Sequence, residues 1–397
     1  MRIGIFTDSY PPQINGVATV SALLNKVFKE HGHEVYVITV SNSKLTQPYE
    51  VNGNIIGISS KAIKNLYNYR WASIYPRIAA RFLASLNLDI IHVQTELTIG
   101  IFARLLAKIY SIPIVYTYHT TYEDYTYYVT KGNVPFDKFA KKVVAAFSKT
   151  LGNNSTEFTT TSEKTKDLLK TYGVTNFINV IPNGLDLSLF LNKDFKEEII
   201  QYKKDHDLEN KFICLLLGRL AQEKSFDVVL KNINAYIQKT NRDDIRVLVV
   251  GSGPAEEDLK KIVEESNLKG YVEFLGFVPY ERTAFYYYLS DLFISASLTE
   301  TQGLTFIEAM ASGLPVLARF DECLSGVIED KVNGFFYNTE DEFIKSFDYF
   351  FELSEEDKKF MKEKAKFLVV DKYSSEKYYH RMLDVYNRAL RKCWWNI

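Results

Sequence analysis

The chain has 397 residues, of which 46% are hydrophobic and 24% are charged, which is enough apolar material for two ordinary domains. The net charge of −1 gives no reason to expect nucleic-acid binding. The three cysteines are scattered and odd in number, so they predict neither a disulfide framework nor a zinc site, and they favour the reducing cytosol.

Charge is divided unevenly along the chain. Residues 1–187 hold 19 Lys and Arg against 13 Asp and Glu, whereas the remainder holds 29 against 36. This asymmetry predicts that the first half meets an anionic surface. No apolar run approaches the ~18 residues needed to cross a bilayer, and the first residues already have a strand pattern. Neither a spanning helix nor a signal peptide is therefore expected, and any membrane contact is expected to be peripheral.

Short apolar segments alternate with helix-patterned segments in both halves. In the first half, strands are expected at 2–7, 34–39, 90–93, 114–118, 157–161 and 178–181, with a helix at 17–30. In the second half, they are expected at 212–217, 246–250, 272–275, 292–295 and 316–318. This alternation predicts an α/β protein with two doubly wound, Rossmann-like units, each a parallel sheet covered on both faces.

A turn-rich run at 181–186 is expected to join the units, so the domains are predicted as 1–184 and 185–374, followed by a helix at 375–392. Ligands of open α/β sheets bind at the carboxyl ends of the strands. With two such sheets, a cleft between them is the default site.

Two features of the first half follow strand ends. Gly16 opens the first helix after a turn-rich loop, where a phosphate or an ordinary βα loop fits equally well. His119 follows the strand at 114–118 and can donate to a sugar hydroxyl. The loop after it carries Tyr122 and Tyr125, which would flank an acceptor with apolar and polar parts or simply pack together. His92 and Glu96 follow a neighbouring strand, and a structural role is favoured for both.

Two basic stretches, at 61–86 and 135–149, also carry aromatic residues. In the first, Arg70, Arg77 and Arg81 have helical spacing, and Pro76 is expected to start a new helix. In the second, Lys138, Lys142 and Lys149 share one helical face, beside an apolar face that contains Phe139, Val143 and Phe147. Such helices suit an anionic membrane, and ordinary surface helices are the alternative.

In the second half, Arg219 and Lys224 emerge after the strand at 212–217. Two cations at a strand's carboxyl end can neutralise a diphosphate, or form a solvated loop pair. The glycine-rich run 251–254 after the next strand could border a nucleotide, but such turns are common. Asp205 and Asp207 form an Asp-x-Asp pair at the wrong end of a strand for a ligand, so solvated surface is expected.

Glu300 and Glu308 stand eight positions apart, with Gly303 and a helix start between them. A helix start offers unpaired N–H groups and the positive end of a dipole to a phosphate. Glycine lets the backbone approach closely, and a carboxylate on either side can accept hydrogen bonds from hydroxyls. A ligand with a central phosphate and polyols at both ends fits this pattern, as a nucleotide-sugar does.

The Glu300–Glu308 pair resembles the E-x7-E signature of the retaining GT-B glycosyltransferases, the glycogen-synthase-like family four. Arg219 with Lys224, Gly16 and the turn at 181–186 match the other landmarks of that family in order, over nearly the whole chain. Within the family, the run 119–125 resembles the bacterial 1,2-diacylglycerol 3-alpha-glucosyltransferases, the monoglucosyl-diacylglycerol synthases.

This resemblance implies a GT-B fold whose domains face each other across a cleft, with the C-terminal helix of 375–397 crossing back onto an acceptor- and membrane-facing first domain. It implies a second domain that binds the nucleotide-sugar. Arg219 and Lys224 would hold the diphosphate, Glu308 the ribose, and His119 the donor sugar's 6-hydroxyl. The other donor contacts it implies are Glu300, Gln302, Gly303, Leu304 and Thr305 at the sugar and Phe277 and Val278 near the base.

The expected enzyme moves glucose from UDP-glucose to diacylglycerol, with retention, on the inner face of the cell membrane. No cofactor is expected to be tightly bound and no metal site is expected, although a divalent cation could stimulate. A soluble sugar, a polyprenol-linked glycan or a protein remains open as the acceptor. A non-catalytic glycan-binding subunit is the alternative from another class.

Overall fold

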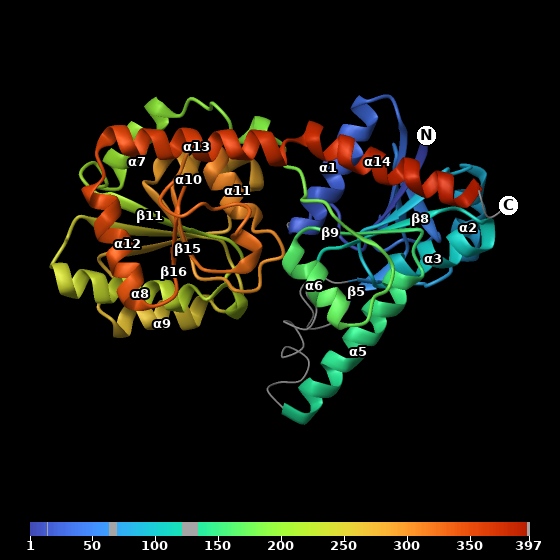
Figure 1. Cartoon of the computed structure of the whole chain (residues 1–397), viewed down its shortest axis with the longest axis horizontal. Helices are drawn as coiled ribbons and strands as arrows, with labels where there is room; N and C mark the ends of the chain where they lie inside the picture. The colour runs from blue at the N-terminus through green and yellow to red at the C-terminus, as the bar shows by residue number, and fades with distance from the viewer. Residues whose placement is uncertain (14, 63–69, 121–133, 395–397) are drawn as a thin grey trace. The chain divides into compact units, whose positions relative to one another are not determined.

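The computed structural model describes residues 1–394 except 14, 63–69 and 121–133 (Figure 1). It divides the chain into two compact units. The first comprises residues 1–184 with the C-terminal segment from Ser375, and the second comprises Leu185–Ser374.

The first unit is built on an eight-stranded sheet in the order β10-β9-β8-β7-β1-β2-β4-β3, in which only the β3–β4 pair is antiparallel among the described residues. The central strands are almost wholly buried, as expected for parallel strands with helices on both faces. The strands are β1 (Arg2–Phe6), β2 (Glu34–Val40), β3 (Tyr49–Asn52), β4 (Ile55–Ile58), β7 (Ile90–Val93), β8 (Ile114–Tyr118), β9 (Glu157–Thr160) and β10 (Ile178–Val180).

The helices of this unit have clear start signals. Asn15 caps α1, because its side-chain Oδ1 accepts from the Ala18 N–H at 2.9 Å, and Ser162 caps α6 in the same way. The helices are α1 (Gly16–Glu30), α2 (Arg77–Ser85), α3 (Thr98–Tyr110), α5 (Val134–Asn153), α6 (Glu163–Thr171) and α14 (Ser375–Trp394).

The first basic stretch is not one helix. Arg70 lies in β6 (Arg70–Ala72), which pairs antiparallel with β5 (Ser60–Ala62), so the expectation that it shares helical spacing with Arg77 and Arg81 was wrong. The Arg70 guanidinium donates to Ser60 Oγ at 2.8 Å and thereby ties the two strands together. Pro76 precedes the first turn of α2, as predicted.

Helix α14 packs on the first unit although it ends the chain, and Figure 1 shows it beside α1. Its aromatic side chains Tyr378 and Tyr386 are buried. Near its end, Lys392 Nζ lies 2.7 Å from Glu157 Oε1, and Arg388 donates to Asn179 Oδ1 at 2.7 Å. The helix is therefore held by apolar contacts and by polar contacts to β9 and β10.

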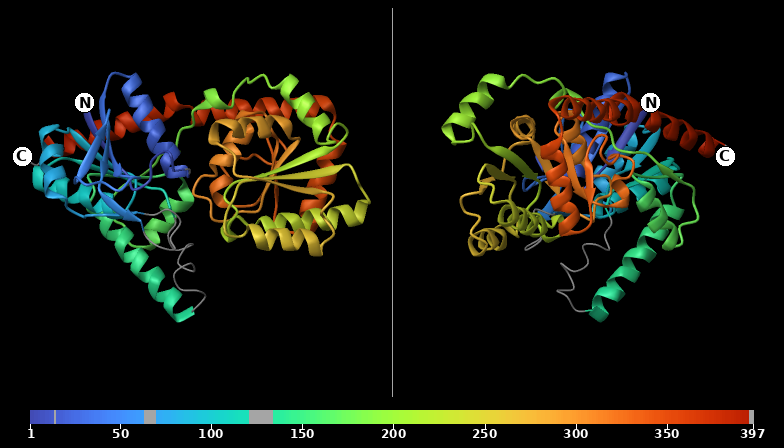
Figure 2. Two further views of the ribbon diagram at one scale, coloured as in Figure 1. Left: turned by 180° about the vertical axis from the view of Figure 1, so that it is seen from behind. Right: turned by 60° about the vertical axis from the view of Figure 1, so that its left-hand side comes forward.

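The second unit is a six-stranded sheet, parallel throughout, in the order β13-β12-β11-β14-β15-β16. Figure 2 shows its helices on both faces of the sheet. The strands are β11 (Phe212–Leu217), β12 (Ile245–Val250), β13 (Val272–Gly276), β14 (Leu292–Ser295), β15 (Val316–Arg319) and β16 (Phe335–Tyr337). The helices are α7 (Lys196–Asp205), α8 (Phe226–Thr240), α9 (Glu256–Glu265), α10 (Tyr280–Leu289), α11 (Leu304–Ala311), α12 (Glu340–Glu352) and α13 (Glu355–Tyr373).

Each sheet has a point where the chain reverses its direction of travel across the strands. In the second unit this switch point lies between β11 and β14, and in the first it lies between β1 and β7. Ligands of open α/β sheets bind outside the carboxyl ends of the strands at such points. The loops after these four strands are therefore the places to look for a site.

Candidate functional site

The loops after β11 and β14 carry four charged side chains at the switch point of the second unit. Lys224 Nζ lies 2.6 Å from Glu300 Oε1, which joins the two loops. Arg219 donates to Glu223, whose side chain is only 2% exposed. Both expected cations thus have a carboxylate partner, and Glu223 is a member of the cluster that the sequence analysis missed.

The helix start after β14 is held open by Gly303. Its φ of +77° lies in the left-handed region, and a Cβ there would come within 2.8 Å of Phe306 and 2.9 Å of Leu324. No side chain caps the amino end of α11, and no acidic residue lies in its first turn. The N–H groups of Leu304 and Thr305 therefore begin a helix whose dipole favours an anion.

The glycine-rich run 251–254 supports the Arg219 loop. A Cβ at Gly251 would lie 1.9 Å from the carbonyl oxygen of Gly218, so only glycine allows this approach. The Leu220 N–H donates to the Ser252 carbonyl at 3.1 Å, and the Ala255 N–H donates to the Leu220 carbonyl at 2.9 Å. The run buttresses the loop that carries Arg219.

Glu308 points into the second unit from α11 and is 4% exposed. Tyr287 Oη donates to its Oε2 at 2.8 Å, and Tyr280 Oη donates to its Oε1 at 3.0 Å. Burial raises the pKa of Glu308 to about 7, although the two tyrosine hydroxyls act in the opposite direction. The sequence analysis missed both tyrosines, whose seven-residue spacing puts them on one face of α10.

Two expected base contacts follow β13. Phe277 is 58% exposed, and Val278 packs partly against the core of the second unit. Gln302, next to Gly303, is buried. The structure thus brings Arg219, Lys224, Glu300 and Gly303 together at one sheet edge, with an exposed aromatic ring after another strand of the same edge.

In the first unit, His119 follows β8 and is 7% exposed. Its Nε2 lies 2.6 Å from Gln94 Oε1, and burial lowers the pKa of His119 to about 4. His92 is fully buried, with Nδ1 2.7 Å from Tyr386 Oη, and Glu96 accepts from Tyr116 Oη at 2.6 Å. Both side chains are thus tied to neighbouring elements of the first unit, which agrees with the structural role expected for them.

The remaining predicted residues are placed as follows. Gly16 begins α1 and is exposed. Tyr122 and Tyr125 lie outside the described residues. Asp205 and Asp207 are exposed near the amino end of β11, as predicted. Among the described residues, no three His, Cys, Asp or Glu side chains are grouped to hold a metal ion.

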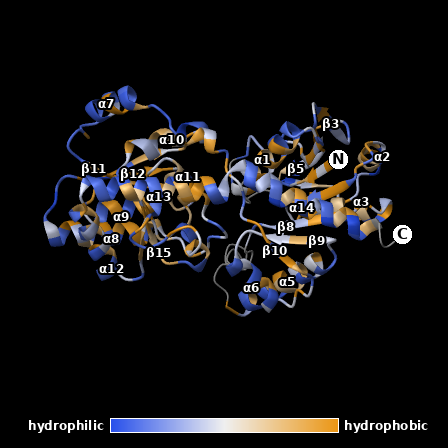
Figure 3. Ribbon diagram, turned by 45° about the horizontal axis from the view of Figure 1, so that its top comes forward, coloured by the Kyte–Doolittle hydropathy of each residue, from blue (hydrophilic) through white to orange (hydrophobic). Residues whose placement is uncertain are grey.

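The second basic stretch is part of α5, as predicted. Its apolar residues Phe139 and Val143 are 62% and 51% exposed, and Lys138 and Lys142 are also exposed. Figures 1 and 3 show this helix extending beyond the body of the first unit, with hydrophobic and hydrophilic residues interspersed. No helix in the described part of the chain is both long and apolar enough to cross a bilayer.

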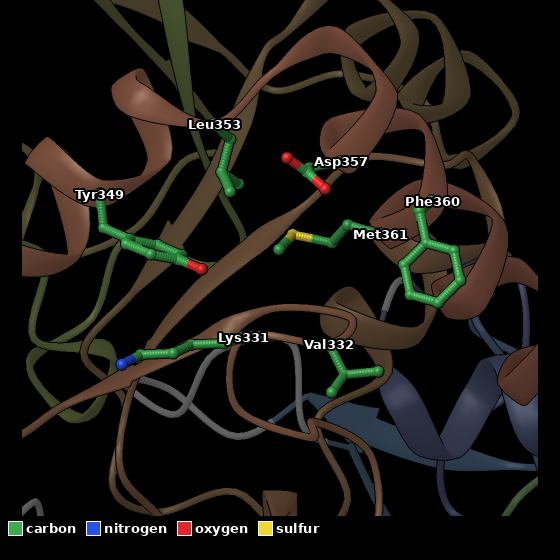
Figure 4. A pocket seen from close by; sticks show the side chains of 7 residues that line it. All are labelled: Lys331, Val332, Tyr349, Leu353, Asp357, Phe360 and Met361. Carbon is green, nitrogen blue, oxygen red and sulfur yellow. The ribbon is translucent and has the colours of Figure 1, made fainter.

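A surface pocket of about 250 Å³ lies elsewhere in the second unit (Figure 4). Lys331 and Tyr349 line one part of it, and Phe360 and Met361 line another. None of its lining residues belongs to the cluster after β11 and β14. It has no part in the site described above.

Comparison with known proteins covers both units. The glycosyltransferase family 4 model matches residues 14–189, and the model for glycosyl transferases group 1 matches residues 198–367. The chain is 35% identical over 351 residues to an alpha-monoglucosyldiacylglycerol synthase of Acholeplasma laidlawii, with 87% of each chain covered. It is 34% identical over 339 residues to the synthase of the same name from Streptococcus pneumoniae, covering 85% of this chain and 75% of that protein.

Solved structures show the same architecture at lower identity. Anabaena HepE in complex with UDP and glucose superposes with a TM-score of 0.76 at 16% identity, covering 97% of this chain and 98% of that one. Sucrose-phosphate synthase from Thermosynechococcus elongatus superposes with a TM-score of 0.73 at 17% identity, covering 98% of both chains. These likenesses establish the fold.

Proposed function

Because this chain belongs to the GT-B glycosyltransferases of family 4, we propose that it transfers glucose from UDP-glucose to diacylglycerol at the surface of an anionic membrane. The proposal adds a donor, an acceptor and a place of action to the family's activity. Two relatives of at least 34% identity carry the name alpha-monoglucosyldiacylglycerol synthase, and the solved HepE complex holds UDP and glucose.

The part of the proposal that concerns the donor is supported by the cluster of charged side chains at the switch point of the second unit. Lys224 and Arg219 stand beside an uncapped helix start, so cationic side chains and backbone N–H groups converge at one sheet edge. We assign the diphosphate to these groups, the sugar to Glu300 and the N–H groups of 302–305, and the ribose to Glu308. Phe277 would lie near the base and His119 at a sugar hydroxyl.

The reaction we propose retains the configuration at the sugar's anomeric carbon. The bond from that carbon to the diphosphate oxygen breaks, and the bond to the acceptor oxygen forms on the same face. The proton of the acceptor hydroxyl passes to the leaving diphosphate, and Arg219 with Lys224 stabilises the charge that develops there. This route assigns no side chain the role of a covalent nucleophile.

The part of the proposal that concerns the acceptor rests on α5. Its exposed apolar face contains Phe139, Val143 and Phe147, and Lys138 and Lys142 flank that face. A helix of this kind lies in the plane of a membrane surface, with its apolar side chains between the acyl chains and its lysines at anionic headgroups. The protein would thereby reach a lipid acceptor on the inner face of the cell membrane, where nucleotide-sugars are available.

One assay tests donor and acceptor together. The purified protein is incubated with labelled UDP-glucose, UDP-galactose or GDP-mannose, with and without diacylglycerol in phosphatidylglycerol vesicles. We expect label in the lipid only with UDP-glucose and diacylglycerol, and an α-linked product by NMR. Label in lipid from another donor would change the assigned sugar, and a β-linked product would overturn retention. Transfer to soluble glycans but not to lipid would replace the acceptor, and no transfer with any acceptor would favour a binding subunit.

A further inference from the structure

A row of buried polar side chains runs through the first unit and ends at His119. His119 Nε2 lies 2.6 Å from Gln94 Oε1, and Gln94 Nε2 lies 2.8 Å from His92 Nε2. At the other end, His92 Nδ1 lies 2.7 Å from Oη of Tyr386 on α14. Gln94, His92 and Tyr386 have no exposed surface, so none of these contacts can be replaced by bulk water.

The row determines which nitrogen of each ring carries the proton. Burial lowers the pKa of His119 to about 4 and that of His92 well below its usual value, so both rings are neutral at neutral pH. A neutral imidazole has one N–H donor and one bare acceptor nitrogen. Gln94 turns its carbonyl oxygen toward His119 Nε2, which must therefore carry the proton. Nδ1 of His119 is then a bare acceptor.

The same rule applies to the rest of the row. Gln94 turns its NH2 group toward His92 Nε2, so this nitrogen accepts and Nδ1 of His92 donates to Tyr386 Oη. Thr117 Oγ1, 2.7 Å from His92 Nε2, can donate to it as well. If the Gln94 amide were turned round, every side chain of the row would have to exchange its donor and acceptor roles, including Tyr386 on α14. The orientation of Gln94 is thus coupled to the docking of the C-terminal helix.

We propose that Gln94 is a positioning residue that holds His119 with its proton on Nε2, so that Nδ1 accepts a hydrogen bond from a hydroxyl of the donor sugar. His92 and Tyr386 fix the orientation of the Gln94 amide from behind. Among the described residues, the His119 ring has no hydrogen-bond partner other than Gln94 Oε1. The sugar hydroxyl rests on the proposed function, whereas the position of the proton does not.

The proposal makes a chemical distinction between sugar analogues. The 6-hydroxyl of the sugar can donate a hydrogen bond to a bare Nδ1. A fluorine in place of that hydroxyl cannot donate, and the lone pairs of the fluorine would face the lone pair of Nδ1. A 6-deoxy-6-fluoro donor should therefore react more slowly than a 6-deoxy donor, by about ten-fold. If Nδ1 carried the proton instead, the 6-deoxy-6-fluoro donor should react faster than the 6-deoxy donor.

The first test observes the proton without any substrate. Full-length protein labelled with ¹⁵N-histidine is measured by NMR, and the His119 signals are assigned with His119→Asn. We expect the ring to be the Nε2–H form in the wild type. Gln94→Glu keeps an acceptor at Nε2 and should keep this form, whereas Gln94→Leu should populate the Nδ1–H form. An Nδ1–H ring in the wild type, or an unchanged ring in Gln94→Leu, would overturn the proposal.

The second test asks whether Tyr386 acts through the row of hydrogen bonds or only by holding α14 in place. Tyr386→Phe removes the acceptor for His92 Nδ1–H, so the row should partly reverse and the Nδ1–H form of His119 should grow. Tyr379→Phe is the matched control, because Tyr379 lies on the same helix and its hydroxyl contacts His33 instead. Equal spectra for the two variants would overturn the part assigned to Tyr386. A correct tautomer in a protein that transfers no glucose would refute the proposed function and the sugar contact, and would leave the role of Gln94 in placing the proton standing.

Discussion

Lys224 joins the loops after β11 and β14, because its Nζ lies 2.6 Å from Glu300 Oε1. If these loops hold a diphosphate, Lys224→Ala and Arg219→Ala should each lower kcat about 100-fold, because a charge contact made to the leaving group is lost. Lys231→Ala is the control, since Lys231 pairs with Asp227 on the exposed side of α8. Steady-state rates of the two variants within about three-fold of wild type would refute the diphosphate role.

Glu308 gives a pH effect that does not depend on the proposed reaction. Burial raises its pKa from 4.5 to about 7, so the folded protein holds this proton more tightly than the unfolded chain does. The resulting stability is fully present below about pH 4.5 and is lost as the pH rises through about 7. A gap of this size corresponds to about 3 kcal/mol.

Urea unfolding at pH 5 and pH 8 measures this effect. Glu308→Gln cannot titrate, so its free energy of unfolding should fall less between the two pH values than that of the wild type. Glu322→Gln, at an exposed position of the same unit, should keep the wild-type difference. Identical differences in wild type and Glu308→Gln would show that Glu308 titrates as an ordinary carboxyl group.

Sequence reasoning picked out the candidate-site residues that follow strand ends and missed the residues that contact them. Arg219 and Glu300 are recognisable because each comes shortly after a buried apolar strand. Glu223 is hidden beside Lys224, where a Glu-Lys pair looks like solvated surface. Tyr280 and Tyr287 lie in an aromatic-rich helix, where their rings resemble ordinary core and only the fold reveals that their hydroxyls meet Glu308.

At the scale of elements, the strands of both sheet centres were confirmed to within one residue at either end, because buried parallel strands form continuous apolar runs. The strands β3, β4, β5, β6 and β16 were missed. All five have only three or four residues. In β3, β5 and β6 several side chains are also exposed, so these strands lack the apolar run on which the prediction relied. Arg70 was wrongly assigned to a helix for the same reason.

Helix α5 carries the membrane prediction. Lys138, Lys142 and Lys149 are exposed on one helical face, and each basic residue near an anionic bilayer is worth about 1 kcal/mol. Replacing all three by Glu should strongly reduce sedimentation with phosphatidylglycerol vesicles. The same reversal at Lys164, Lys166 and Lys170 of α6 should have a smaller effect. Donor hydrolysis, which needs no lipid, should survive in both variants, and equal sedimentation of the two would remove α5 from the membrane contact.

At the carboxyl end of α7 we predict substitutions that have no effect on activity. Asp205 and Asp207 are exposed near the amino end of β11, away from the strand ends that carry Arg219 and Glu300. Replacing both by Asn should therefore leave kcat and the donor KM nearly unchanged. A large loss of activity that excess Mg²⁺ or Mn²⁺ restores would show that this pair binds a metal.

Charge is divided more unevenly between the two structural units than between the two halves of the sequence, because the C-terminal helix belongs to the first unit. Residues 1–184 and 375–397 hold 24 Lys and Arg against 14 Asp and Glu, whereas 185–374 holds 24 against 35. The units therefore carry +10 and −11 within a chain whose net charge is only −1. A field of this kind draws one unit toward an anionic surface and repels the other.

This polarity predicts how membrane binding responds to salt. Screening acts over about 10 Å at 0.1 M ionic strength and about 3 Å at 1 M, so attraction between the first unit and anionic lipid should weaken steeply as salt rises. Full-length protein should sediment with phosphatidylglycerol vesicles at low salt, much less at 1 M, and little with neutral phosphatidylcholine vesicles at any salt. The α5 variant with three glutamates should lose most of its salt dependence along with its binding. Equal sedimentation with neutral and anionic vesicles, unaffected by salt, would mean that apolar insertion alone holds the protein at the membrane and would remove charge from the argument for a lipid acceptor.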